Sequence, residues 1–244
     1  MRQEHRAGEK LFIDFCGPTV PVINLDTGEI HRVAIFVVVM GAPNYTCVEA
    51  CEDQDMMSWL NAPSRCLTFQ GGVPKQLIPD NLRSAVKKAD NYEPVINDSY
   101  QALAEHYSTV IIPARPRKPT DKPKAENSVL IVERWLLARI HNETFRTLRA
   151  LNARFRELLT DMNNRPMKGY ANQSRVERFR ILDVPALSPL PMEPYEYTEY
   201  KAVKVGSDYH VEYARHWYSI PHELVGQRLS LKAGQSAVQL WHKG

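Results

Sequence analysis

The sequence lacks several patterns that would point to a particular class of protein. Its only cysteines are Cys16, Cys47, Cys51 and Cys66, and they include no CxxC pair and no companion histidine cluster with zinc-ligand spacing. Four cysteines in 244 residues are typical of buried thiols in a reducing compartment rather than of a disulfide framework. We therefore expect a cytoplasmic protein with neither a structural zinc site nor disulfide bonds.

Long apolar runs and a large charge imbalance are also missing. The apolar run at residues 33–42 is shorter than the roughly 20 residues that span a bilayer, so we expect no membrane partner. The formal net charge of +3 is too small to indicate nucleic acid by itself. The remaining composition is that of a globular chain, long enough for one large domain or for a medium domain and a small one.

One acidic residue stands out in the first stretch that has strand character. Residues 10–17, KLFIDFCG, show the alternation and the aromatic and branched side chains of a half-buried strand, with Asp14 near its centre. An unpaired, ionised carboxylate in an apolar setting costs several kcal/mol, so Asp14 needs a cation, a hydrogen-bond network or an altered pKa. We interpret Asp14 as a metal ligand that shares its ion with two later carboxylates.

The order of the predicted elements indicates the fold. Strands at 10–17, 31–40 and 45–50 are separated by short turns, which predicts an antiparallel meander. The later elements are a helix at 53–69, a strand at 75–79, a helix at 98–107, a strand at 109–114, and helices at 126–141 and 148–162. This order is that of an α/β, ribonuclease H-like fold, with a five-stranded mixed sheet and flanking helices.

The end of the chain has a different pattern. Residues 185–194 contain four prolines and read as a linker. Five short strand candidates follow, punctuated by glycines, and predict a small all-β barrel. We expect a linker from an upstream region at 1–9, a catalytic core at 10–184, the Pro-rich linker at 185–194 and the barrel domain at 195–244.

On this layout, three acids from distant parts of the chain converge at one edge of the sheet. Asp14 lies in the first strand, Asp80 ends the fourth strand, and Glu126 opens a helix. Mg²⁺ is usually held by a few carboxylates together with water and phosphate, and two ions about 4 Å apart can support in-line displacement at phosphorus. Glu133 is a rival for the third position, because seven residues return it to nearly the same helix face.

Several blocks of sequence, in order, resemble the catalytic core of IstA-type insertion-sequence transposases, which are DDE transposases with a retroviral-integrase-like core. These blocks are LFIDFCG, GGVPKQLIPDNLRSAV, NYEP, YQALAEHY, PARPRKPTDKPKAENSV and VERWLLARI. The stretch DYHVEYARHWYSIPHELVG resembles the family's small β-barrel. The resemblance implies that Asp14, Asp80 and Glu126 are the family's three acids and bind two Mg²⁺ or Mn²⁺ ions per active site.

The resemblance also implies an activity and partners. The activity is that of a DDE polynucleotidyl transferase, which cleaves at transposon DNA ends and transfers the 3′-hydroxyl into target DNA on the bacterial nucleoid. The implied partners are transposon-end and target DNA, further copies of the chain assembled on DNA, and a helper AAA+ ATPase of the IstB type. Two alternatives stay open: a catalytically dormant DNA-binding and assembly module, and a ribonuclease H-like nuclease that only hydrolyses.

Two groups of cations are candidates for contact with DNA. The first group precedes Glu126 and comprises Arg115, Arg117, Lys118, Lys122 and Lys124. Such runs are usually only solvated, but beside a site that cuts phosphodiesters they favour backbone contact without sequence readout. In the predicted barrel, cations at 215, 228 and 232 accompany His216 and Trp217, a mixture that suits DNA, a second subunit or a plain barrel surface.

Overall fold

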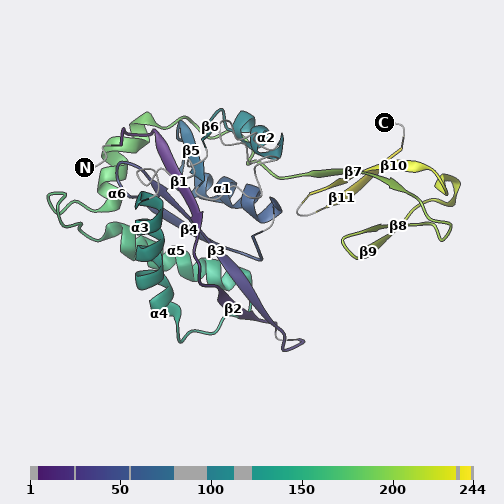
Figure 1. The fold of residues 1–244 in the computed structure, drawn as a ribbon, viewed down its shortest axis with the longest axis horizontal. Helices are drawn as coiled ribbons and strands as arrows, with labels where there is room; N and C mark the ends of the chain where they lie inside the picture. The colour runs from purple at the N-terminus through teal and green to yellow at the C-terminus, as the bar shows by residue number, and fades with distance from the viewer. Residues whose placement is uncertain are drawn as a thin grey trace. The chain divides into compact units, whose positions relative to one another are not determined.

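A computed structural model of the chain describes residues 5–24, 26–54, 56–79, 98–112, 123–234 and 237–242. The chain falls into two compact units, Met1–Tyr195 and Glu196–Gly244. Figure 1 shows helices packed around a sheet in the first unit and short strands in the second. None of the helices in the described ranges is long and apolar enough to cross a membrane.

The sheet of the first unit is mixed. Its strands are β1 (Lys10–Phe15), β2 (Val20–Ile23), β3 (Ile30–Met40), β4 (Thr46–Cys51), β5 (Gln76–Pro79) and β6 (Val110–Ile111). β3 pairs antiparallel with β1, β2 and β4, whereas β5 pairs parallel with both β1 and β6. The predicted ribonuclease H-like mixed sheet, with its antiparallel meander, is therefore confirmed, and β2 adds a short strand along β3.

The alternation of β1 separates two faces of this sheet. The helices α1 (Met56–Gln70) and α2 (Asp98–His106) belong to one face. Phe15 points to that face, where its ring centroid lies 5.9 Å from that of Trp59. Cys16 packs on the opposite face, in a core that contains Leu136. β3 is buried on both faces from residue 33 to its end, as its continuous apolar run predicts.

A long helix covers the second face in three segments. α3 (Pro123–Val132) continues through a π-helical turn (Glu133–Leu137) into α4 (Ala138–Ile140). The predicted start at Glu126 is three residues late. The helix begins at Pro123 because proline suits the first helical position, where no backbone N–H is needed. Glu126 therefore lies inside the first turn rather than at the opening of the helix.

α5 (Leu148–Asn164) packs on the same face and closes the outer edge of the sheet. Asn152 accepts the N–H of Ala50 at 2.7 Å and donates to its carbonyl at 3.0 Å. Asn163, about three helical turns further on, makes the same pair of bonds with Thr46. The two amides thus satisfy backbone groups along the outer side of β4, which is one way in which proteins cover an edge strand.

A helical stretch at residues 175–186 has no counterpart in the prediction. It consists of α6 (Arg175–Arg178), a π-helical turn (Phe179–Asp183) and a 3-10 turn (Val184–Ala186). A capping box opens it, in which Ser174 and Glu177 accept each other's backbone N–H groups. The buried carboxylate of Asp183 accepts the N–H of Gly8, which ties the opening residues of the chain to the first unit.

The second unit contains short strands around one apolar core. They are β7 (Glu199–Lys204), β8 (His210–Tyr213), β9 (His216–Ser219), β10 (Arg228–Ala233) and β11 (Val238–Trp241), with a 3-10 turn at His222–Leu224. β10 pairs antiparallel with β7 and β11, and β8 pairs antiparallel with β9. Val211 and Leu231, from different sheets, share the core. The predicted all-β end is therefore confirmed as two small antiparallel sheets.

Candidate active site

Asp14 lies at the carboxyl end of β1, one position before the strand ends. Residues two apart on a strand point the same way, so Asp14 shares the face of Cys16, which is the face that α3 covers. Its side chain is half-buried, and its Oδ1 accepts the backbone N–H of Phe15 at 2.8 Å. The fold thus orients this carboxylate at a strand end beneath a helix.

Apolar side chains flank Asp14 on its face of the sheet. Phe12, two residues earlier, is buried in a cluster with Val39 and Ile78. Val37, directly across the ladder, belongs to the main core of that face. A carboxylate in such a place loses part of its hydration, so cations and hydrogen-bond donors stabilise its charge. Its hard oxygen ligands suit Mg²⁺ or Mn²⁺.

The parallel pairing of β1 and β5 leads to the second predicted ligand. The register ends with Ile13 beside Pro79. In the sequence, Asp14 follows Ile13 and Asp80 follows Pro79. Asp80 itself lies outside the described residues, so its role as a ligand stays a prediction.

The third predicted ligand, Glu126, lies on α3, where the structure describes its backbone but not its side chain. Helix geometry puts position 126 on one stripe with Val129 and Glu133, which are both half-buried. Val132 and Leu136, beside this stripe, are buried against the sheet. The stripe therefore follows the flank of the sheet-facing side of the helix.

The Cys16 thiol connects this helix stripe with the end of β1. Burial raises the pKa of the Cys16 thiol to about 12, and the negative charges of Glu133 and then Asp14 contribute to the rise. Charge effects of this kind decay with distance, so both carboxylates lie in the surroundings of the same sulfur. The described residues thus bring Glu133, the first residue of the π-helical turn, into the surroundings of Cys16 at the end of β1.

The π-helical turn that begins at Glu133 is a feature that sequence reasoning missed. The N–H of Ala138 donates to the carbonyl of Glu133, five residues back. The buried positions 132, 136 and 140 recur every four residues along this helix. An ordinary α-helical face also accommodates positions spaced by four, so the sequence carries no signal for this turn.

In the ranges that the structure describes, no group of three or more His, Cys, Asp or Glu side chains is arranged to hold a metal ion. This finding does not test the predicted triad, because Asp80 and the side chain of Glu126 lie outside the described part of the chain. Of the cations predicted to contact DNA, Arg115, Arg117, Lys118 and Lys122 lie outside the described residues. Lys124 lies in the first turn of α3, but its side chain is not described.

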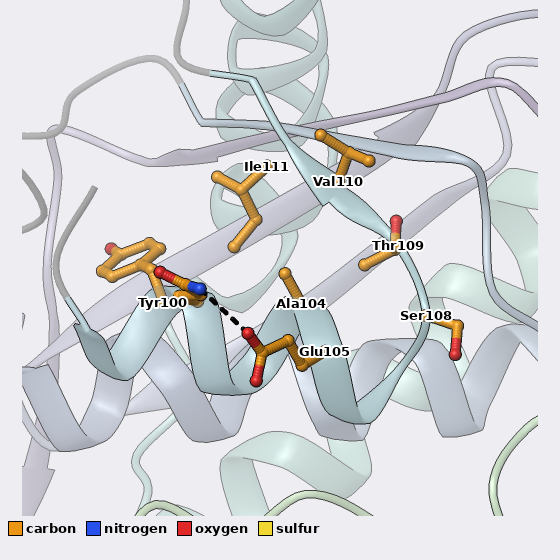
Figure 2. A pocket seen from close by; sticks show the side chains of 8 residues that line it. Tyr100, Ala104, Glu105, Ser108, Thr109, Val110 and Ile111 are labelled. Carbon is orange, nitrogen blue, oxygen red and sulfur yellow. Dashed lines mark hydrogen bonds between the residues drawn. The ribbon is translucent and has the colours of Figure 1, made fainter. Parts of the chain in front are cut away.

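A separate cavity of about 330 Å³ lies between α2 and β6 (Figure 2). Tyr100, Ala104 and Ile111 give it apolar walls, and the carboxylate of Glu105 accepts the side-chain amide of Gln101 at 2.9 Å. Among the described residues that line it, Glu105 is the one acid, and Asp14 is not part of the lining. We therefore place the candidate active site at the end of β1 and not in this cavity.

The chain is similar over nearly its whole length to proteins named as transposases. It is 48% identical over 241 residues to one in Sinorhizobium fredii, a match that covers 99% of this chain and 46% of that protein. It is 44% identical over 244 residues to the protein named as the transposase for insertion sequence IS408 in Burkholderia multivorans, covering 100% of this chain and 47% of that protein. The chain spans about half the length of these curated relatives.

The end of the chain and its fold also have counterparts. Residues 190–244 match the family model described as Mu transposase, C-terminal domain. The fold is similar to a chain in the cryo-electron microscopy structure of the simian T-cell lymphotropic virus intasome in complex with PP2A regulatory subunit B56 gamma. The TM-score is 0.53 at 12% identity, and the match covers 99% of this chain and 78% of that chain. At this identity the likeness is one of fold.

Proposed function

Because this chain is homologous over its whole length to part of the insertion-sequence transposases, we propose that it is the catalytic core and C-terminal all-β domain of a DNA transposase. The proposed reaction is cleavage at a transposon DNA end, followed by transfer of the 3′-hydroxyl into target DNA. The observation that carries the proposal is the position of Asp14. Its carboxylate lies at the carboxyl end of β1, in an integrase-like sheet, on the face that α3 covers.

Asp14, Asp80 and Glu126 form the proposed metal-binding triad. Oxygen ligands of this kind fit Mg²⁺ or Mn²⁺, and a bound pair of ions supplies activation of the attacking oxygen and stabilisation of the leaving one. The N–H of Phe15 holds Oδ1 of Asp14, so this ligand is oriented before substrate arrives. The residues of the chain contribute by positioning and by charge, without a covalent intermediate on the protein.

Glu133 is the alternative for the third acid. It lies two helical turns beyond Glu126, about 10 Å further along the helix axis, and its charge acts on the Cys16 thiol at the end of β1. The family resemblance supports Glu126 in the ligand role. The proximity of Glu133 to β1 makes it the control that any test of the triad needs.

The remaining parts of the proposal concern partners. The cations from Arg115 to Lys124 are proposed to contact the phosphate backbone of DNA next to the triad. The family resemblance supports assembly of several copies of the chain on paired DNA ends and a helper ATPase of the IstB type. Both are partners proposed for transposases of the relatives' full length, about half of which this chain spans.

Strand transfer is the experiment that tests the proposal. The full-length protein is mixed with a duplex that carries the transposon's terminal sequence, a target plasmid, and Mg²⁺ or Mn²⁺, and the products are resolved on a gel. We expect joined products from the wild type and from Glu133→Gln, but none from Asp14→Asn or Glu126→Gln. Joining by Asp14→Asn at the wild-type level would overturn the assignment.

Two other product patterns identify the alternatives. Metal-dependent cleavage without joined products in the wild type indicates a nuclease that only hydrolyses. Binding of DNA without metal-dependent cleavage indicates a binding and assembly module.

A further inference from the structure

In the second unit, β7, β10 and β11 form one sheet (Figure 1). The outer face of this sheet has an unusual set of side chains. Leu229, Leu231 and Ala233 of β10 are buried in the core of the unit, so the alternate positions point outward. The strand register arranges these outward positions in three rows. The rows are Tyr200–Lys232–Gln239, Ala202–Ser230–Trp241 and Lys204–Arg228. We refer to this set as the aromatic–cationic face.

Both aromatic residues of the face are open to solvent. Tyr200 is 72% exposed and Trp241 is 51% exposed. Aromatic rings are among the side chains that gain most from burial, so two exposed rings on so small a sheet indicate a surface that a ligand covers. The rings lie on the two outer strands, on either side of β10, in adjacent rows.

The face carries charge of one sign. Lys204, Arg228 and Lys232 contribute three cations, and none of the positions in the rows, all of which are described, is acidic. Glu199 of β7 belongs to the inner side of the strand, where it accepts the hydroxyl of Tyr213 at 2.7 Å. The Lys232 ammonium lies 5.9 Å from the ring centroid of Tyr200, so cation and ring present one continuous surface.

The β8–β9 hairpin of the same unit carries an exposed aromatic ring in a different electrostatic setting. Trp217 is 63% exposed there, but the register puts it opposite the carboxylate of Glu212. An acid beside the ring repels a phosphate backbone, so this tryptophan lacks the electrostatic half of a nucleic-acid site. Trp217 is therefore a matched control for Trp241.

We propose that the aromatic–cationic face binds an unpaired, single-stranded segment of DNA. Bases stack on Tyr200 and Trp241, while the cations of the face pair with the phosphates between them. Duplex DNA keeps the faces of its bases inside the stack, so exposed rings have nothing to stack on there, whereas an unpaired strand offers every base. The proposal rests on the proposed function only for the choice of DNA as the polymer.

The test measures binding by fluorescence anisotropy, in EDTA, with a labelled oligothymidylate of about 20 nucleotides and a duplex of the same length. The double variant combines Tyr200→Leu with Trp241→Leu. We expect it to weaken binding of the single strand by about tenfold or more, and binding of the duplex by less than about twofold. Trp217→Leu should change neither affinity by more than about twofold. Thermal unfolding of each variant checks that the unit still folds.

A second pair of variants tests the charges. Lys204→Gln and Arg228→Gln should each lower the slope of log single-strand affinity against log salt concentration by about 0.7. These variants leave both rings in place, so they keep the proposal testable if the double aromatic variant does not fold.

Three results would overturn the inference: no binding of the single strand by the wild type, unchanged single-strand affinity in the double variant, or an equal loss for single strand and duplex. None of these measurements needs metal or catalysis, so Asp14→Asn should bind the single strand as the wild type does. Failure of strand transfer with intact single-strand binding would contradict the proposed function alone. Intact strand transfer with unchanged affinity in the double variant would contradict this inference alone.

Discussion

The two main sheets of this protein use the same alternation of side chains in opposite ways. In the first unit, helices cover both faces of the sheet, so polar chemistry is confined to a strand end, where Asp14 lies. In the second unit, the outer face of β7, β10 and β11 stays open and carries cations and rings. A sheet that is covered on both faces can orient a few carboxylates for catalysis, whereas a sheet with an open face can bind an extended polymer such as single-stranded DNA.

The largest expected effect is that of Asp14→Asn, which should separate catalysis at the first sheet from DNA binding at the second. Asp14→Asn keeps an oxygen for the N–H of Phe15 but removes the charge, and it should reduce strand transfer by about 100-fold or more. Its affinity for single-stranded DNA should stay within about twofold of the wild type. The yield of joined product and the anisotropy titration, measured on the same preparations, check both halves.

The comparison between the sheets fails if Asp14→Asn loses joining and binding together. In that case the end of β1 would belong to the binding surface, and the division of work between the two sheets would be wrong.

A smaller effect concerns how the first sheet is closed at its edge. Asn152→Ala should lower the free energy of unfolding by about 2–3 kcal/mol, because both the N–H and the carbonyl of Ala50 lose their partner. The matched control is Asn164→Ala on the same helix, where the exposed amide donates only to the carbonyl of Thr160 and where we expect less than about 0.5 kcal/mol. Urea unfolding measures both, and equal losses would show that the amide of Asn152 does not support the edge.

The smallest expected effect lies in the second unit, where a hydrogen bond from Tyr213 of β8 to Glu199 of β7 connects the two small sheets. Tyr213→Phe removes the bond to Glu199 and should cost about 1 kcal/mol at neutral pH. Burial, with Glu199 next, raises the pKa of Tyr213 to about 12 from the usual 10.0. The folded state therefore favours the neutral phenol, so the contribution is complete below pH 10 and is lost as the pH rises toward 12.

Unfolding curves of the wild type and Tyr213→Phe, at neutral and at alkaline pH, test whether the stability difference between them shrinks as the pH rises. Tyr209 is exposed, so Tyr209→Phe is the control. A difference between wild type and Tyr213→Phe that grew with pH would contradict the assigned role of the hydrogen bond.

Features that depend on local pattern could be predicted from the sequence. The alternation in β1, the apolar run of β3 and the apolar face of α5 each lie within one element, so the ribonuclease H-like sheet and its helices followed from them. The five strands of the second unit were also visible as short runs between glycines. Asp14 was recognisable because a carboxylate interrupts an otherwise apolar strand.

Features that depend on distant partners could not be predicted. Asn152 and Asn163 look like ordinary helix residues until β4 supplies backbone groups for them. The stretch at 175–186 is short and mixed in composition, and its contact with Gly8 joins opposite ends of the unit. At the candidate site, the sequence ranked Glu133 second by helical spacing, but only the fold shows that its charge reaches the end of β1.

Binding of Mn²⁺ to the full-length protein, measured by titration calorimetry without DNA, tests the central claim most directly. The account predicts metal binding by the wild type and by Glu133→Gln, and its loss in each of Asp14→Asn, Asp80→Asn and Glu126→Gln. Retained binding in Asp14→Asn would contradict the claim, and so would loss in Glu133→Gln with retention in Glu126→Gln.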